Sequence, residues 1–133
     1  MTDRKNETGL LWDFIRDVPV YLTGVRVFRR QVLGGVRVGK SEARLQVGIP
    51  GQADAYALFP GGGHVEIETK AIGGRFSPLQ DGWALYCRTF EIPYIALRPA
   101  RGETDAETVR RWVRELAQAS AFIRAPRDAP AGP

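Results

Sequence analysis

The sequence predicts an α/β or α+β domain in which a mixed central sheet is flanked by helices. Two segments, Ser77-Pro78-Leu79-Gln80 and Thr104-Asp105-Ala106-Glu107, have the capping-box pattern that is typical of helix N-termini. Between residues 20 and 70, runs of β-branched and aromatic residues alternate with glycine-rich turns, which favours strands. The 133 residues fit a single domain over residues 1–124, followed by a disordered tail at 125–133 that has too little apolar mass to pack.

The first predicted helix runs from about Asn6 to Asp17, with Asn6 as its N-cap and Pro19 ending it. Its apolar residues recur at helical spacing and place Glu7 at the centre of the apolar face. A carboxylate in that position either frays at the start of the helix or reaches towards a polar site. Strands are expected at residues 20–32 and, more briefly, at 36–38 and 45–47 beside a basic loop.

A β-hairpin is predicted from residues 53–59 and 64–70, around the turn Pro60-Gly61-Gly62-Gly63. If Asp54 lies opposite Lys70, then Tyr56 lies opposite Glu68, and the two acids are diagonal neighbours on one face. A shift of register by one residue would separate them.

Two further helices and one strand complete the predicted order. The helix that follows Ser77 is expected to bury Leu79, Trp83, Tyr86 and Phe90, and a strand is expected at 92–97, beginning at Pro93 or lying at an edge. The helix that follows Thr104 turns a regular stripe to the core: Val109, Trp112, Val113, Leu116 and Ile123. Core packing accounts for Trp12, Trp83 and Trp112 better than base stacking does, and Cys87 is expected to be a small buried apolar residue.

Composition and charge narrow the class of protein. The hydrophobic share is 44% and the charged share 26%, and no apolar run approaches the ~18 residues of a spanning helix, which predicts a soluble protein with no membrane partner. No signal peptide is recognisable and a single cysteine cannot form an internal disulfide, so a cytoplasmic location is expected. Residues 20–51 carry six basic side chains and one acidic side chain, a balance of +5 within a net charge of +4. This cluster indicates either polyanion binding or a solvated strand surface protected from edge pairing.

The chemistry of the predicted hairpin depends on Asp54, Glu68 and Lys70. Two ionised carboxylates repel one another unless a cation neutralises them. Oxygen ligands without histidine or cysteine favour Mg²⁺ or Mn²⁺, and such an ion polarises a phosphoryl group. The alternative is an ordinary strand face with one Asp–Lys pair, since an acid two residues before a lysine also occurs by chance.

Four motifs in order resemble the VRR-NUC family, the virus-type replication-repair nuclease branch of the PD-(D/E)xK superfamily. They are Gly-x-x-Asp at 51–54, a glycine-bearing hairpin, Glu-x-Lys at 68–70 and Ser-Pro-x-Gln at 77–80, and the resemblance extends from about Glu7 to Leu97. It implies a restriction-endonuclease-like core, with residues 1–124 as the nuclease domain.

The resemblance also implies roles for individual residues. Asp54 and Glu68 would ligate the metal, with the Thr69 carbonyl and Glu7 as further ligands, and Lys70 would serve the attacking water. The Gln80 side chain would contact the active site, a role that can coexist with its place in the capping box. Glu66 would be a peripheral acid, and His64 either touches phosphate or is solvated. Contacts to the DNA backbone are expected from basic residues of two segments: Arg29, Arg30, Arg37, Lys40 and Arg75.

The function expected from this resemblance is that of a Mg²⁺- or Mn²⁺-dependent DNA endonuclease of bacterial or phage origin. Its substrate would be branched or junction DNA in replication, repair, recombination or phage maturation, and a homodimer is expected. The alternatives are a DNA-binding or assembly module that keeps the fold without catalysis, and a nuclease directed at RNA.

Overall fold

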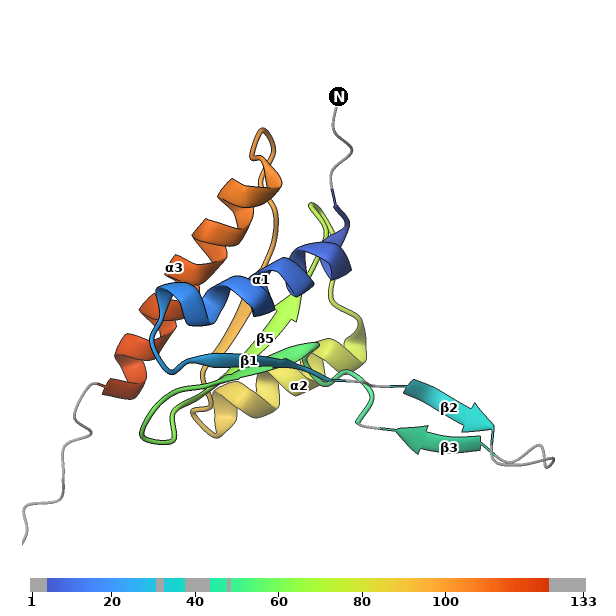
Figure 1. Cartoon of the computed structure of the whole chain (residues 1–133). Coiled ribbons are helices and arrows are strands. Elements are labelled where there is room, and N and C mark those ends of the chain that lie inside the picture. Colours follow the sequence, from blue (N-terminus) through green and yellow to red (C-terminus); the bar gives the residue numbers. More distant parts are fainter. Residues whose placement is uncertain (1–4, 31–32, 38–43, 48, 125–133) are drawn as a thin grey trace, which may run out of the picture.

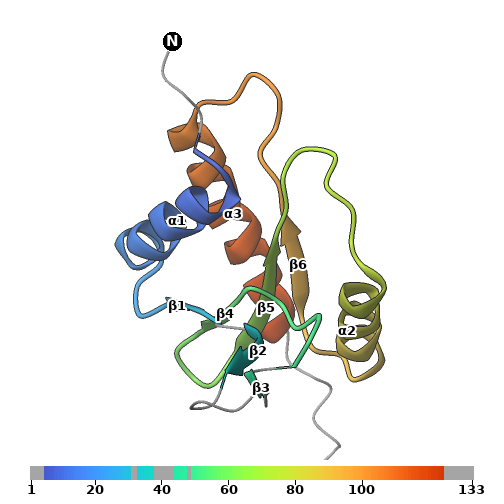
Figure 2. The same ribbon diagram turned by 90° about the vertical axis from the view of Figure 1, so that its right-hand side faces the viewer.

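A computed structural model describes residues 5–30, 33–37, 44–47 and 49–124, and within them the chain forms three helices and six strands (Figure 1). Helices α1 (Glu7–Tyr21) and α3 (Asp105–Arg124) cover one face of a four-stranded sheet, and α2 (Pro78–Thr89) lies on the other side (Figure 2). The predicted class, a mixed sheet flanked by helices, is confirmed. Within the described ranges, no helix has the length and apolarity that crossing a membrane requires.

The central sheet has the strand order β1-β4-β5-β6, formed by Arg26–Arg29, Ala55–Leu58, His64–Thr69 and Tyr94–Leu97. The pairs β1–β4 and β4–β5 are antiparallel, whereas β5 and β6 are parallel. Strand β6 is therefore an edge strand, which agrees with the proline just before it. Strands β2 (Leu33–Arg37) and β3 (Arg44–Val47) form a separate antiparallel pair.

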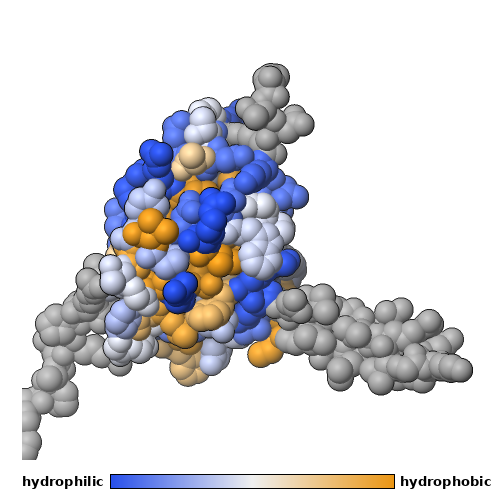
Figure 3. Space-filling view, in the orientation of Figure 1, coloured by the Kyte–Doolittle hydropathy of each residue, from blue (hydrophilic) through white to orange (hydrophobic). Residues whose placement is uncertain are grey.

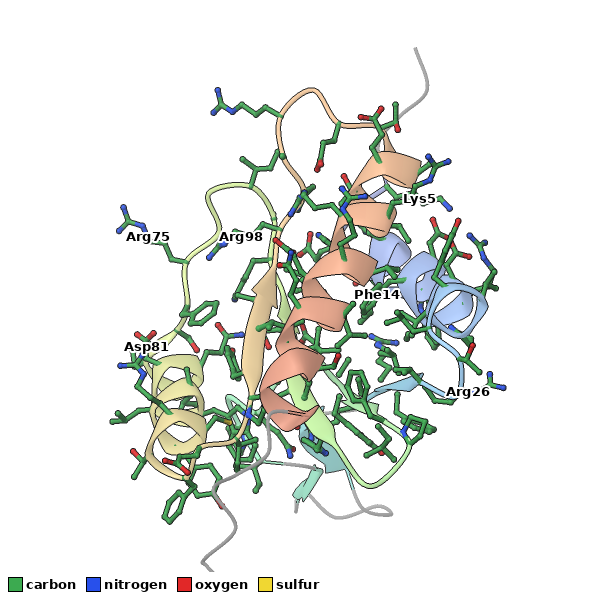
Figure 4. The ribbon with its side chains drawn as sticks, turned by 90° about the vertical axis from the view of Figure 1, so that its left-hand side faces the viewer. Lys5, Phe14, Arg26, Arg75, Asp81 and Arg98 are labelled. Atoms are coloured by element: carbon green, nitrogen blue, oxygen red, sulfur yellow. The ribbon has the colours of Figure 1, made fainter. Side chains whose placement is uncertain are left out.

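The hydrophobic core lies between the sheet and the layer of α1 and α3. Phe14 of α1 and Trp112 of α3 are fully buried and meet edge to face, with ring centroids 5.9 Å apart. Figure 4 shows Phe14 pointing inward from α1. Val65 and Ile67 of β5 supply the sheet side of the same cluster, so this face of β5 is apolar as its alternating sequence predicts.

The helix α1 begins as predicted but ends later. Asn6 is the N-cap, because its side-chain oxygen accepts from the Gly9 amide at 2.9 Å. The helix passes through Pro19 and ends at Tyr21, so the prediction that Pro19 ends it is wrong. Only the last turn follows this proline, and the Leu22 amide still donates to the Val18 carbonyl at 2.8 Å. Within residues 20–30 of the strand predicted at 20–32, the strand found is β1, and residues 31–32 lie outside the described residues.

The hairpin exists, but its register differs from the predicted one by two residues. Tyr56 lies opposite Glu66, and Leu58 lies opposite His64. The Phe59 amide donates to the Gly63 carbonyl at 2.9 Å. Phe59 therefore pairs with Gly63 and the turn is shorter than the predicted register requires. Because the shift is even, every side chain keeps its face, and Asp54 moves from diagonal to nearly opposite Glu68.

Helix α2 has the predicted start but not the predicted buried stripe. Its capping box between Ser77 and Gln80 is complete. Leu79, Tyr86 and Phe90 are exposed, Trp83 is half-buried, and Cys87 is buried as predicted. Among the described elements, its backbone approaches the sheet at β6, and the side chains of Gln80 and Trp83 reach β5. The rest of its surface has no layer to cover it.

The other predictions for helical side chains have mixed outcomes. Trp112 lies in the core as predicted, together with Val109, Val113 and Leu116, whereas Trp12 is exposed. The side chain of Ile123, residue Val38 and the predicted tail at 125–133 lie outside the described residues. Viewed as in Figure 1, the surface mixes hydrophilic and hydrophobic residues (Figure 3), so exposed apolar side chains are not confined to α2.

A pair of leucines tests this assignment of the core. Leu116 on the buried face of α3 is 0% exposed, whereas Leu85 on α2 is 58% exposed. We expect Leu116→Ala to lower the free energy of unfolding by about 2–5 kcal/mol, because it leaves a cavity, and Leu85→Ala to change it by less than about 0.5 kcal/mol. Urea denaturation of both variants measures this, and equal effects would contradict the layer arrangement.

Candidate active site

Asp54 and Glu68 meet where β4 begins and β5 ends. The Asp54 amide donates to Glu68 Oε2 at 3.1 Å, and Asp54 Oδ2 accepts from the amide and hydroxyl of Thr69 at 3.0 and 2.9 Å. The two carboxyl groups are thereby fixed beside each other by backbone and side-chain donors. Both of these hydrogen bonds to the Asp54 carboxyl group use Oδ2.

Glu68 is a buried acid whose ionisation is strongly perturbed. It is 1% exposed, and burial together with the negative charge of Asp54 raises its pKa to about 7. The hydrogen bond from the Asp54 amide and the charge of Lys70 oppose this rise without cancelling it. The site therefore has an unmet preference for positive charge.

Lys70 and Gln80 extend the same cluster from β5 to the start of α2. Gln80 Nε2 donates to Glu68 Oε1 at 2.9 Å, and Lys70 Nζ donates to Gln80 Oε1 at 2.7 Å. Lys70 Nζ also lies 3.8 Å from Glu68 Oε1. Gln80 Oε1 accepts from the Ser77 amide at 2.9 Å, so the capping role and the site role of Gln80 coexist.

A glycine allows the two halves of the site to approach. Gly51 has φ +84°, and a Cβ built on it would lie 2.3 Å from the backbone carbonyl group of Leu79. Any other residue would force the loop before Asp54 away from the start of α2. Steric exclusion of a side chain therefore explains why the Gly-x-x-Asp motif has glycine at this position.

These residues line a hollow of about 520 Å³, which we call the acid hollow. Glu7 and Arg29 are also on its wall, so the first turn of α1 reaches the site as one of the two sequence interpretations proposed. Glu7, Asp54 and Glu68 contribute acids, and Arg29, Arg30 and Lys70 contribute bases.

The donor set fits a hard divalent cation held by few protein ligands. Within the described residues, no three side chains among His, Cys, Asp and Glu form a metal-binding group, and metal ligation by Glu7 stays a prediction. Asp54 and Glu68 remain as two adjacent carboxylates. Mg²⁺ is commonly bound by one or two carboxylates together with waters and phosphate oxygens, and this pair matches that pattern.

The basic residues expected to touch DNA fall into different environments. Arg29 is exposed, and its guanidinium lies 5.4 Å from the centre of the Trp12 ring. Arg75 is exposed on the loop before α2, and Figure 4 shows its side chain pointing outward. The side chain of Arg37 and the whole of Lys40 lie outside the described residues.

Arg30 is committed to a buried ion pair. Nη1 and Nη2 of its guanidinium each donate to a carboxylate oxygen of Glu66 at 2.6 Å, and Nη1 also donates to the Ala53 carbonyl at 3.2 Å. Its backbone amide donates to the Asp54 carbonyl at 2.7 Å. Arg30 therefore holds the segment that carries Asp54, and its charge is already neutralised by Glu66.

Glu66 is the centre of this second cluster. It is 2% exposed, and it accepts from Trp83 Nε1 at 3.0 Å and pairs with His64 as well as with Arg30. Burial alone raises the pKa of Glu66, but the hydrogen bonds from Arg30 and His64 and the charge of Arg30 hold it below its usual range. Glu66 is thus a structural anchor, and His64 is its partner.

Sequence reasoning missed the part that Trp83 plays in this cluster. Glu66 and Glu68 are two apart on a strand, and Gln80 and Trp83 are three apart on a helix, so each pair shares one face. Gln80 binds Glu68 and Trp83 binds Glu66. This matched spacing is the signal that was present in the sequence.

Comparisons of the chain with protein-family models, with curated proteins and with solved structures found no match. The interpretation of the site therefore depends on its own geometry.

The Arg30–Glu66 pair gives a prediction about stability. We expect Glu66→Gln to lower the free energy of unfolding by about 3–5 kcal/mol, because it leaves the Arg30 charge buried without its partner. Asp17→Asn, which breaks an exposed pair with Arg16, should leave stability unchanged within error. Guanidinium denaturation of both variants measures the difference, and a neutral Glu66→Gln would show that the pair is dispensable.

The raised pKa of Glu68 gives a prediction about pH. Its folded-state pKa of about 7 exceeds the ordinary 4.5, so its contribution to stability is complete below pH 4.5 and is lost as the pH rises through 7. In buffer with EDTA, Glu68→Gln should match the wild type at pH 4 and be more stable at pH 8, by up to about 3 kcal/mol. Denaturation across this pH range measures the gap, and a constant gap would contradict the assignment.

Proposed function

We propose that this chain is a Mg²⁺- or Mn²⁺-dependent endonuclease of the VRR-NUC type, with a PD-(D/E)xK core, that hydrolyses phosphodiester bonds in DNA. The observation that carries the proposal is the convergence of Asp54, Glu68, Lys70 and Gln80 on one hollow. These residues come from three elements that are separated in sequence, and their order matches the motifs that resemble this family. A chance Asp–Lys pair on an open strand does not explain a buried Glu68.

Each residue has a distinct task in this proposal. Asp54 and Glu68 would hold the cation, which supplies Lewis-acid polarisation of the phosphate and a more acidic bound water. Lys70 would place its ammonium beside the attacking water or the phosphate oxygens. Gln80 would fix both Glu68 and Lys70, since it bonds to each of them.

Three parts of the proposal follow from the family resemblance alone. They are the preference for branched or junction DNA, the homodimer, and a role in replication, repair, recombination or phage maturation. Arg29 and Arg75 support contact with the DNA backbone, because both are exposed on the described surface. Arg30 does not belong to this group in our proposal, since Glu66 already occupies its guanidinium.

A second candidate is a DNA-binding or assembly module without catalysis. It is favoured by one observation: Asp54, Glu68 and Lys70 each already have a hydrogen-bond partner within the protein. Catalysis requires that a cation and a phosphate compete successfully with these partners. A cleavage assay therefore separates the two functions.

Substitutions at three positions should reduce Mg²⁺-dependent cleavage of branched and linear DNA to different extents. We expect Asp54→Asn and Lys70→Met each to lower the cleavage rate by about 10²-fold or more, and Gln80→Ala by about 10- to 100-fold. Asp81→Asn is the matched control, because Asp81 is adjacent to Gln80 but exposed, and Figure 4 shows it at the outer side of α2.

The assay is run with Mg²⁺, with Mn²⁺ and with EDTA, and in parallel on RNA. Wild-type protein that binds DNA without cutting it under any of these conditions would favour the non-catalytic module. Cleavage that persists in Asp54→Asn would assign the activity to a contaminant, and faster cleavage of RNA would change the substrate class.

A further inference from the structure

Helix α2 presents a row of aromatic rings beside the acid hollow. Trp83, Tyr86 and Phe90 follow one another at spacings of three and four, with ring centroids 5.2 and 4.9 Å apart. Tyr86 is 46% exposed and Phe90 is 64% exposed. Core packing does not account for Tyr86 and Phe90, because both side chains remain largely exposed, whereas Trp83 is half-buried.

These rings form one wall of a second hollow of about 920 Å³, which we call the aromatic groove. Its opposite wall is the glycine loop 61–63 with His64. A volume of this size lies within the range of sites that hold small organic ligands. The groove is therefore large enough for planar groups to enter.

The aromatic groove adjoins the acid hollow. Arg30 and Gln52 line both of them, so an extended ligand held in one hollow lies beside the other. The buried Glu66 forms the floor between the walls, since it binds Trp83 on one side and His64 on the other. The rings thus have a fixed position relative to Asp54 and Glu68.

The chemistry of the groove suits bases better than phosphates. Its arginine and histidine are both paired with Glu66, so they offer no uncompensated charge to a phosphate. Gly61 and Gly62 have φ near +90°, and a Cβ at either position would meet nothing within 4 Å, so the loop wall is open. Flat rings and an open backbone wall accept stacked bases of any sequence.

We propose that the aromatic groove binds unpaired nucleobases of a DNA strand whose backbone lies in the acid hollow. This inference deepens the proposed function and rests on it for the identity of the polymer. It assigns the single-stranded part of a substrate to Tyr86, Phe90 and the exposed part of Trp83. The enzyme then acts where paired DNA gives way to an unpaired strand.

The test is a binding measurement that does not need cleavage. Fluorescence anisotropy in EDTA compares labelled oligothymidylate with a duplex of the same length. The variant carries Tyr86→Ala and Phe90→Ala, and the control carries Leu79→Ala and Leu85→Ala, which remove exposed apolar side chains from the same helix. We expect the aromatic variant to bind the single strand about tenfold more weakly or worse, with duplex affinity within twofold and the control unchanged.

Three results would overturn the inference. The first is unchanged single-strand affinity in the aromatic variant, and the second is an equal loss in the leucine control. The third is loss of a dimer in the aromatic variant, seen by light scattering, which would assign the groove to a second copy of the chain. Failure of the nuclease proposal has a different signature: wild-type protein that binds the single strand in EDTA but cuts no DNA with Mg²⁺ or Mn²⁺.

Discussion

The repulsion between two neighbouring carboxylates is the constraint on which the site depends. Asp54 and Glu68 are held together by the Asp54 amide and by Thr69, although both carry negative charge when ionised. The rise in the pKa of Glu68 from 4.5 to about 7 corresponds to about 3 kcal/mol of unfavourable free energy for the ionised form. A fold that retains such a pair gains from a ligand that neutralises it, and a divalent cation is the simplest one.

The surrounding structure keeps this pair in place from several directions. Gly51 lets the loop before Asp54 contact the start of α2, and Gln80 joins that helix to Glu68 and Lys70. On the neighbouring turn, Trp83 reaches Glu66, which holds Arg30 against the carbonyl of Ala53. One helix therefore anchors two acids of the same strand, one at the acid hollow and the other beneath the aromatic groove.

Local sequence signals predicted the elements more reliably than the environment of their side chains. Capping residues identified the starts of α1 and α2, and helical spacing identified the buried face of α3. Exposure of Tyr86 and Phe90 was not predictable in this way, because an aromatic stripe has the same spacing whether or not another layer covers it. The error at Pro19 has a similar origin: the helix tolerates this proline because only its last turn follows, and the local sequence does not show where that turn ends.

The residues of the candidate site could be predicted in part from the sequence. Even the wrong register brought Asp54, Glu68 and Lys70 to one face, because a shift of two residues preserves the alternation of a strand. The pairing of Arg30 with Glu66 could not be predicted, since it joins the residue after β1 to β5 across β4 and no local pattern encodes that contact. This ion pair distinguishes Arg30, which has a structural role, from the exposed Arg29 beside it.

A crystal structure of the protein soaked with Mn²⁺ tests the central claim most directly, because manganese is located by its anomalous scattering. The account predicts a peak within bonding distance of carboxylate oxygens of both Asp54 and Glu68, and its absence in crystals of Asp54→Asn. An empty acid hollow at saturating Mn²⁺, or a peak bound elsewhere and unaffected by Asp54→Asn, would contradict it.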